Sequence, residues 1–418
     1  MSDDKSGLDY RISGMAMSDI TSALVANFMG GVRRNRMPAA GFLWGPPGIG
    51  KTFATYGAAR QIGRLTNQEV VIFDVPTSCL EPSDVAGVPF PVSLDGEEQF
   101  CRYLGSEWAW FSSVEYEQWM QKQDPSFVAP AGILLFDDLV AAHFQTQAAF
   151  FKGVHEGKWG SCTQRKNVMV VGAGNRVSDN AGANDMPTAL ANRFRHYYAA
   201  PTTKDWLLWA GGFREVGETG VIGEPRIHSL VQAYIRRAED KLSDFDDDVA
   251  MRAEKAFASP RSWENVSELI YEGESIDTGE GEANDSRFAK SCMGIIGRGA
   301  AMNFLAFIRG SATLVPAEDI IADPLGAPMP PRSELDALHA TVTSLETHVK
   351  QNLETWEKGM QYGLRPDIVS DLGFLLCQSI TRVVMSEFNA DERMEAMNSP
   401  VFEKMLTKFE DLLDLIEG

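Results

Sequence analysis

The stretch Gly45-Pro46-Pro47-Gly48-Ile49-Gly50-Lys51-Thr52 matches the phosphate-binding pattern G-x-x-x-x-G-K-[ST] at every position. The apolar residues 41–44 before it predict a buried strand, and residues 53–62 after it predict a helix. In this context the glycines let consecutive backbone N–H groups face an anion at the helix N-terminus. Lys51 can then reach the β- and γ-phosphates of a nucleotide, and the Thr52 hydroxyl can bind Mg²⁺. The expected nucleotide-binding residues are Gly45, Pro46, Pro47, Gly48, Ile49, Gly50, Lys51, Thr52 and Phe53.

Two carboxylates follow another apolar run. Residues 132–136 predict a buried parallel strand, and Asp137 and Asp138 stand at its tip. Ligands of open α/β sheets bind at this carboxyl edge. One carboxylate can hold Mg²⁺, and the second can orient or deprotonate the attacking water. Taken alone, the pattern also fits a strand with an acidic turn, but its place after a phosphate-binding loop favours the metal site.

A third strand tip carries an amide. Residues 167–174 predict a buried strand that ends at Asn175, where the side chain can hold the attacking water or touch the γ-phosphate. A strand-end Asn in a simple turn is the common alternative. Arg193 and Arg195 follow a short helical segment, and we group Arg193 with the three strand tips. By base rate these arginines are surface charges.

The composition narrows the class of protein. A chain of 418 residues is expected to form two or three domains. The net charge of −20 argues against a general nucleic-acid surface, because phosphate neutralisation needs clustered Lys and Arg, and the sequence has one short basic cluster, Arg33-Arg34-Asn35-Arg36. Five scattered cysteines fit a reducing cytoplasm, and the polar N-terminus has no signal-peptide core. No apolar run approaches the ~18 residues needed to span a bilayer. We therefore expect a cytoplasmic protein.

The chain order indicates three domains. We expect an α/β domain over residues 1–200, a helical domain over residues 201–315 and a helical C-terminal extension over residues 316–418. Residues 76–129, after a predicted strand at 69–75, are long and irregular, which is typical of functional or inserted structure.

Local signals refine this division. The aromatic residues Trp108, Trp110 and Phe111 fit local packing better than a substrate contact. Ser259 and Pro260 predict a helix start. Five prolines between residues 316 and 331 predict an extended linker, followed by helices near 334–358, 367–388 and 400–416.

Together these segments resemble the AAA+ ATPases, most closely the MoxR branch, in the order Walker A, Walker B, sensor 1, arginine finger and sensor 2. The MoxR branch carries an insert between the second strand and Walker B, and residues 76–129 occupy that place. Residues 82–87, 187–194 and 259–264 also look like those ATPases. The resemblance covers residues 15–310. It implies an α/β fold with an AAA+ P-loop parallel-sheet core and helices on both faces, then an all-α lid and a helical C-terminal extension.

The resemblance also implies site roles. ATP and Mg²⁺ would be the cofactors, with Thr52 and Asp137 on the metal. The catalytic set would be Asp138, Asn175 as sensor 1, Arg193 as the arginine finger offered to a neighbouring subunit, and Arg261 as sensor 2; Arg195 is the less favoured finger. A finger supplied in trans implies a homo-oligomer, and this family implies a hexameric ring. The MoxR branch implies a protein partner, such as one carrying a von Willebrand factor A domain.

Three functions remain open on sequence grounds. The first is an ATP-driven machine that remodels a protein partner. The second is a nucleic-acid motor or a component of nucleic-acid defence, which the negative charge disfavours. The third is a nucleotide-switched scaffold that hydrolyses ATP slowly, because Asp138 stands where the resemblance expects the longer Glu.

Overall fold

The computed structural model describes residues 14–94, 98–176, 179, 184–216, 219–222, 225–245, 255–272, 286–310, 315–331 and 334–409. The described residues through Thr202 form one compact unit, and those from Thr203 form a second. The second unit therefore includes both helical regions that the sequence separates at residue 316. Within the described residues, no helix is long and apolar enough to cross a membrane.

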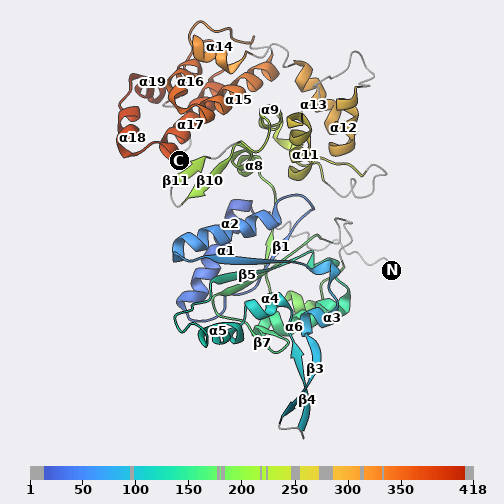
Figure 1. The fold of residues 1–418 in the computed structure, drawn as a ribbon. Coiled ribbons are helices and arrows are strands. Elements are labelled where there is room, and N and C mark those ends of the chain that lie inside the picture. Colours follow the sequence, from blue (N-terminus) through green and yellow to red (C-terminus); the bar gives the residue numbers. More distant parts are fainter. Residues whose placement is uncertain are drawn as a thin grey trace, which may run out of the picture. The chain divides into compact units, whose positions relative to one another are not determined.

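The first unit is built on a five-stranded parallel sheet (Figure 1). The spatial order is β2-β5-β8-β1-β9, so the strand before the phosphate-binding loop is separated from the acidic strand by β8. The strands are β1 (Gly41–Trp44), β2 (Val70–Pro76), β5 (Ala131–Asp137), β8 (Val168–Gly174) and β9 (Arg195–Tyr198).

Alternating side chains of the sheet build two cores, one on each face. Ile133 and Leu135 of β5 pack with residues of α1 (Met17–Arg33) and α2 (Lys51–Thr66). Leu134 and Phe136 point to the other face and pack with α6 (Phe144–Glu156). Helices thus cover both faces, which is why the central strands are apolar without interruption.

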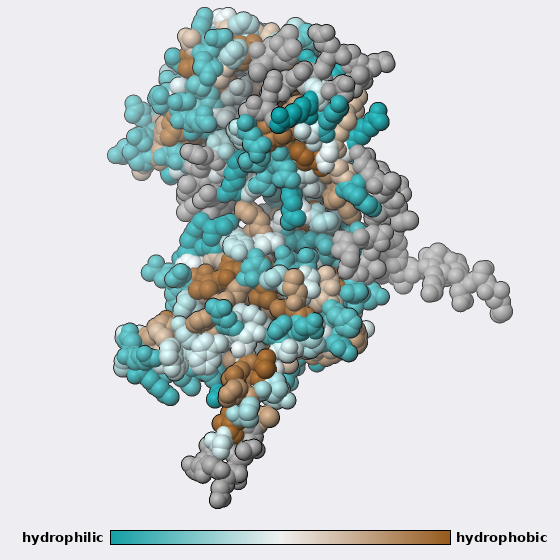
Figure 2. All heavy atoms as spheres, turned by 45° about the vertical axis from the view of Figure 1, so that its right-hand side comes forward, coloured by the Kyte–Doolittle hydropathy of each residue, from teal (hydrophilic) through white to brown (hydrophobic). Residues whose placement is uncertain are grey.

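The region of residues 76–129 is more regular than the sequence predicts. It holds a projecting β3–β4 hairpin and several short helices (Figure 1). Its elements are η1 (Thr77–Cys79), α3 (Pro82–Ala86), β3 (Val88–Leu94), β4 (Glu98–Leu104), α4 (Glu107–Phe111) and α5 (Val114–Gln121). Val88, Phe90 and Leu104 of the hairpin are each about half exposed, and Figure 2 shows hydrophobic atoms along it. The sequence does not predict this hairpin, because prolines interrupt its first strand and its apolar runs are short.

Trp108 confirms the packing interpretation of the aromatic residues. Its ring is buried and makes edge contacts with Phe136 of β5 and Trp159 of a small second hairpin. The remaining elements of this unit are η2 (Leu139–Ala141), β6 (Lys158–Trp159), β7 (Cys162–Thr163) and α7 (Thr188–Ala191).

The second unit is mostly helical and contains two hydrophobic cores. Tyr234, Trp263 and Phe304 centre the first core, while Tyr362, Leu376 and Ile380 are buried in the second. The region expected to be an all-α lid also has an antiparallel hairpin of β10 (Phe213–Val216) and β11 (Thr219–Ile222). The helices of the first region are α8 (Thr203–Ala210), α9 (Ser229–Arg237), η4 (Glu239–Lys241), α11 (Pro260–Tyr271), α12 (Arg287–Ile296) and α13 (Arg298–Gly310).

The predicted extended linker over residues 316–331 is wrong in its first half. Helix α14 (Ala317–Ala322) forms there, with Pro316 at its N-cap and Ile320 fully buried. The other prolines of this stretch begin at residue 324, so nothing in residues 317–322 prevents a helical turn. The following helices are α15 (Leu335–Gln351), η6 (Leu353–Thr355), α16 (Trp356–Gly363), α17 (Ser370–Glu387), α18 (Ala390–Met397) and α19 (Pro400–Lys408).

The predicted fold class is confirmed: a parallel P-loop sheet with helices on both faces precedes helical lid and C-terminal regions. The last predicted helix, near 400–416, lies partly outside the described residues.

Candidate nucleotide site

The phosphate-binding loop joins β1 to α2 as the sequence predicts. Gly50 is the N-cap of α2 and has a φ of 97°, in the left-handed region that glycine tolerates. No side chain caps this helix, so the N–H groups of its first turn remain for an anion. A Cβ at Gly45 would lie 2.5 Å from Cδ1 of Ile49 and 3.1 Å from the carbonyl oxygen of Ala199, so a side chain there would displace Ile49. The loop is built as an anion cradle.

Lys51 links this loop to the tip of β8. Its side chain is buried, and its ammonium donates to the carbonyl oxygens of Gly45 at 2.8 Å and Pro46 at 3.0 Å. It also donates to Oδ1 of Asn175 at 2.8 Å. Phosphate oxygens would make stronger, charge-assisted bonds to the same ammonium. The structure therefore brings Lys51 and Asn175 together at one point of the carboxyl edge.

Thr52 and Asp137 are a second pair of side chains that the fold brings into contact. The Thr52 hydroxyl donates to Oδ2 of Asp137 at 3.3 Å, across 85 positions of sequence. The other carboxylate oxygen of Asp137 accepts the backbone N–H of Asp138 at 3.0 Å. Mg²⁺ is commonly held by one or two protein oxygens together with substrate phosphates. The hydroxyl and carboxylate oxygens fit that requirement, so the residues present are suited to Mg²⁺.

Asp74 is a carboxylate that the sequence analysis did not include. It lies near the carboxyl end of β2, the strand that pairs with the Asp137 strand. Burial raises the pKa of Asp74, the nearby charge of Asp137 raises it further, and a 3.4 Å hydrogen bond from the Tyr56 hydroxyl opposes the shift. A divalent cation would relieve the repulsion between the two carboxylates. Only the pairing of β2 with β5 shows that Asp74 lies near Asp137, and strand pairing cannot be derived from a single sequence.

Asp138 has an unusual backbone conformation. Its φ of 51° and ψ of 36° lie in the left-handed helical region, at the N-cap of η2. Asp and Asn tolerate this region better than most residues. The conformation sets the direction in which the second carboxylate leaves the strand tip, and positive φ values in non-glycine residues often accompany functional sites.

Arg193 does not belong with the strand tips, and that grouping is wrong. Strand β9 runs parallel to β1, with Arg195 opposite Gly41, so Arg193 precedes the amino end of the sheet. The phosphate-binding loop follows the other end of β1. At ~3.3 Å per residue, the four residues of β1 alone separate the two edges by about 13 Å. Arg193 donates to the carbonyl oxygen of Ala189, and its guanidinium lies 5.4 Å from the ring centre of Phe151.

Hydrogen bonds of His196 connect β1, the strand before the phosphate-binding loop, with the segment that contains Arg193. The indole N–H of Trp44, the last residue of β1, donates to Nδ1 of His196 at 2.8 Å. Because an indole nitrogen can only donate, the His196 proton lies on Nε2, which is 2.8 Å from the carbonyl oxygen of Ala191. The imidazole thus connects the end of the phosphate-binding strand with the turn that precedes Arg193.

Arg261 lies in the second unit, in the first turn of α11. Ser259 caps this helix by accepting the backbone N–H of Ser262, and Pro260 is in the first turn, as predicted. Burial and the charge of Glu268 raise the pKa of neighbouring Glu264, while Arg226 and Arg261 oppose the shift. The role of Arg261 at a nucleotide stays a prediction.

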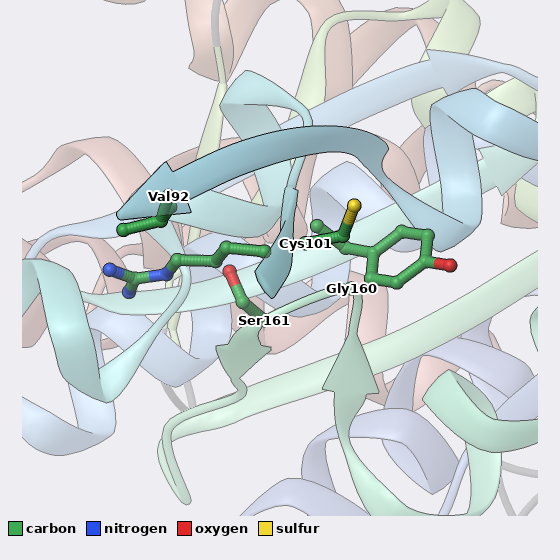
Figure 3. Close-up of a pocket in the computed structure, with 6 residues that line it drawn as sticks. Val92, Cys101, Gly160 and Ser161 are labelled. Atoms are coloured by element: carbon green, nitrogen blue, oxygen red, sulfur yellow. The ribbon is translucent and has the colours of Figure 1, made fainter. Parts of the chain in front are cut away.

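A separate hollow of about 420 Å³ lies at the root of the β3–β4 hairpin. Figure 3 shows Val92 and Cys101 of the hairpin facing Gly160 and Ser161 of the β6–β7 turn. None of the predicted nucleotide-binding residues lines it. The candidate nucleotide site rests on the convergent polar groups described above, and this hollow is a different feature of the unit.

Comparisons with known proteins add little to this geometry. No protein-family model matches the chain, and no curated protein matches it. Among solved structures, the chain is similar to Thermotoga maritima RuvB, both as a proline-to-glycine point mutant and as the form described as a Holliday junction branch migration motor. Each is 12% identical over 80% of this chain, covering 88% and 87% of RuvB with TM-scores of 0.32 and 0.31. At these TM-scores the likeness supports no conclusion about function.

Proposed function

We propose that this chain is a MoxR-like AAA+ ATPase, which couples binding and hydrolysis of Mg-ATP at subunit interfaces to remodelling of a protein partner. The observation that carries the proposal is the convergence of Lys51, Thr52, Asp137 and Asn175 at the carboxyl edge of the sheet. Two strand tips and one anion cradle meet there from positions up to 124 residues apart. If Asp137 and Asn175 were only polar residues of turns, they would not need to contact Thr52 and Lys51.

Each residue has a distinct task in this proposal. The N–H groups at the start of α2 and the Lys51 ammonium bind the β- and γ-phosphates. Thr52 and Asp137 would hold Mg²⁺, which would supply positive charge beside the phosphates. Asp138 orients the water for in-line attack, and Asn175 fixes its position next to the γ-phosphate. Asn175 also holds Lys51, so it would release or share that ammonium when a nucleotide binds.

A second subunit completes the proposed site. Arg193 leaves the sheet at the edge opposite its own phosphate-binding loop, and therefore serves a neighbouring copy. This requirement supports a ring homo-oligomer, with six subunits as the family expectation. The nucleic-acid alternative is tested by titrating labelled oligonucleotides against the same protein.

Changing Lys51 to Ala should weaken ATP binding about 10–100-fold. The change removes charged hydrogen bonds worth about 1.5–3 kcal/mol, and each 1.4 kcal/mol corresponds to tenfold in affinity. Titration of a fluorescent ATP analogue measures this effect. Lys122→Ala, an exposed lysine in α5's C-terminal cap, is the control. Equal affinity of Lys51→Ala and wild-type protein would remove the loop from the nucleotide site.

Changing Asp138 to Glu should raise the steady-state ATPase rate about 10–100-fold, because the shorter Asp carboxylate stands about one methylene too far from the attacking water. The left-handed backbone disfavours Glu by about 1–2 kcal/mol, so the melting temperature is measured in parallel. Asp138→Asn, which tolerates the same backbone, should bind ATP and not hydrolyse it. A rate that falls with Glu would contradict slow turnover as a consequence of Asp138.

The Asp138→Asn form also tests the partner. A subunit that binds ATP and cannot hydrolyse it should retain a remodelled protein, including one with a von Willebrand factor A domain. Affinity purification with Asp138→Asn and ATP, compared with Lys51→Ala and ATP, identifies proteins held in a nucleotide-dependent way. If both variants retain the same proteins, the capture does not depend on nucleotide and the remodelling role fails.

A further inference from the structure

The turn that follows Asp138 is held by residues from two other parts of the chain. It consists of η2 and Ala142, and Leu139, Val140 and Ala142 in it are buried. Within the turn itself, the N–H of Ala141 donates to the carbonyl oxygen of Asp138 at 2.8 Å. Left-handed backbone in a residue other than glycine persists only where the surrounding structure holds it. The contacts made to this turn therefore decide whether Asp138 keeps its conformation.

Gln147, in the first turn of α6, supplies the first set of contacts. Its side chain is fully buried, and its Nε2 donates to the carbonyl oxygens of Ala142 at 3.0 Å and Val140 at 3.4 Å. Both neighbours are acceptors, so the amide nitrogen, and not the amide oxygen, faces the turn. The buried Oε1 has no hydrogen-bond partner among the described residues. Because a buried acceptor without a partner is destabilising, an apolar side chain of similar size would suit a purely structural position better.

Asn184 supplies the second set of contacts from a different part of the sequence. Its backbone N–H donates to the carbonyl oxygen of Val140 at 2.7 Å, and its Nδ2 donates to that of Ala142 at 3.2 Å. Asn184 lies between β8, which precedes Asn175, and α7. The same two carbonyl oxygens thus receive donors from α6 and from the segment that follows β8. When the side-chain donor of one residue is removed, each carbonyl oxygen keeps a donor from the other.

We propose that Gln147 and Asn184 are positioning residues, which hold the turn after β5 so that the Asp138 carboxylate is directed at the water that attacks the γ-phosphate. The inference deepens the proposed ATPase and rests on it for the role of Asp138. The backbone carries the argument, since Asp138 has a φ of 51° and its carbonyl oxygen accepts the first hydrogen bond of the held turn. A displacement of about 1 Å in a group that orients the reactants can lower turnover roughly 100-fold.

Thr146, the neighbour of Gln147, provides a matched control. It is also buried in the first turn of α6, and its hydroxyl donates to the carbonyl oxygen of Leu80 at 3.1 Å. Leu80 follows η1, the turn after β2, and is not part of the turn that follows Asp138. Thr146→Val therefore removes one buried hydrogen bond at the start of α6 and leaves the contacts of Gln147 and Asn184 in place.

The first test compares turnover with ATP binding. Gln147→Met keeps the length of the side chain without its amide, and Asn184→Asp replaces the Nδ2 donor by an acceptor. Each should lower the ATPase turnover number about 3–10-fold, and the double variant at least about 100-fold, because each residue compensates for loss of the other. Binding of a fluorescent ATP analogue should stay within about twofold in all three, and Thr146→Val should keep its turnover within about threefold. Equal losses of turnover in Thr146→Val and the double variant would show general damage to α6 and overturn the proposal.

Hydrogen exchange without nucleotide tests the positioning separately from the chemistry. Mass spectrometry of a peptide covering residues 137–142 reports on the N–H of Ala141, which is bonded to Asp138. Its exchange should be at least about tenfold faster in Gln147→Met/Asn184→Asp than in wild type, and unchanged in Thr146→Val. Asn184 is exposed, so Asn184→Asp serves alone if the double variant does not fold.

The outcomes of the two tests separate this inference from the proposed function. If wild type hydrolyses ATP and the variants keep wild-type exchange and turnover, the two residues do not position Asp138 and the inference fails. If exchange is faster in the variants while wild type does not hydrolyse ATP, the turn is held as proposed and the proposed function fails.

Discussion

Arg193→Ala should lower the ATPase turnover number about 10³–10⁵-fold while leaving ATP binding unchanged. Arginine fingers contribute this much by stabilising charge on the transferred phosphoryl group. One Nη of Arg193 donates to the carbonyl oxygen of Ala189, the guanidinium lies over the ring of Phe151, and the buried Nε has no hydrogen-bond partner among the described residues. Because Arg193 leaves the sheet at the edge opposite its own loop, the loss should be a loss of help to a neighbour.

Steady-state hydrolysis with a fluorescent-ATP titration measures this effect. Arg102→Ala, on the β3–β4 hairpin, is the control for removal of an exposed arginine. A mixture of Arg193→Ala with Lys51→Ala should recover activity, since the first supplies an intact loop and the second supplies the finger. An unchanged rate in Arg193→Ala alone would show that the site is complete within one chain.

The sequence predicted the strands and the helix that carry the candidate nucleotide site because its signals are local. Gly50 and Lys51 are set by a glycine-rich turn between a strand and a helix, and each strand tip follows its own apolar run. Parallel strands share one carboxyl edge, so the meeting of Lys51, Asp137 and Asn175 follows from three separate short patterns. The same logic misplaced Arg193, because a residue before a strand lies at the opposite edge from a residue after one.

Features that depend on pairing across long distances could not be predicted. The sequence contained Arg33-Arg34-Asn35-Arg36 as an isolated cluster, and only the fold places Lys166 beside it, through a hydrogen bond to Asn35. Asp74 likewise became part of the site through the pairing of β2 with β5. The hairpin of residues 88–104 has two prolines in its first strand, which a pattern search interprets as irregular chain.

A buried ionic network in the second unit is another such feature. The carboxylate of Glu346 on α15 lies 2.7 Å from Arg236 of α9 and 2.7 Å from Lys350, and it accepts the Ser379 hydroxyl of α17 at 2.6 Å. Burial opposes ionisation of Glu346, but Arg236 and Lys350 outweigh it and hold its pKa well below the usual range. Burial, with the charges of Arg236 and Arg237, lowers the pKa of nearby His339 to about 4. One acid thus joins three helices.

Glu346→Ala should lower the free energy of unfolding by about 3–5 kcal/mol at pH 7, because it leaves Arg236 and Lys350 buried without a counter-charge. Urea unfolding of the full chain, followed by circular dichroism, measures the change, with exposed Glu357→Ala as the control. The depressed pKa makes the Glu346 contribution complete above its unfolded pKa of about 4.5 and progressively lost below it. The difference from wild type should therefore shrink as the pH falls below 4.5.

Arg236→Met/Glu346→Leu/Lys350→Met should be more stable than Glu346→Ala, since it removes the charges together. If Glu346→Ala costs less than about 1 kcal/mol at pH 7, the network does not hold these helices together.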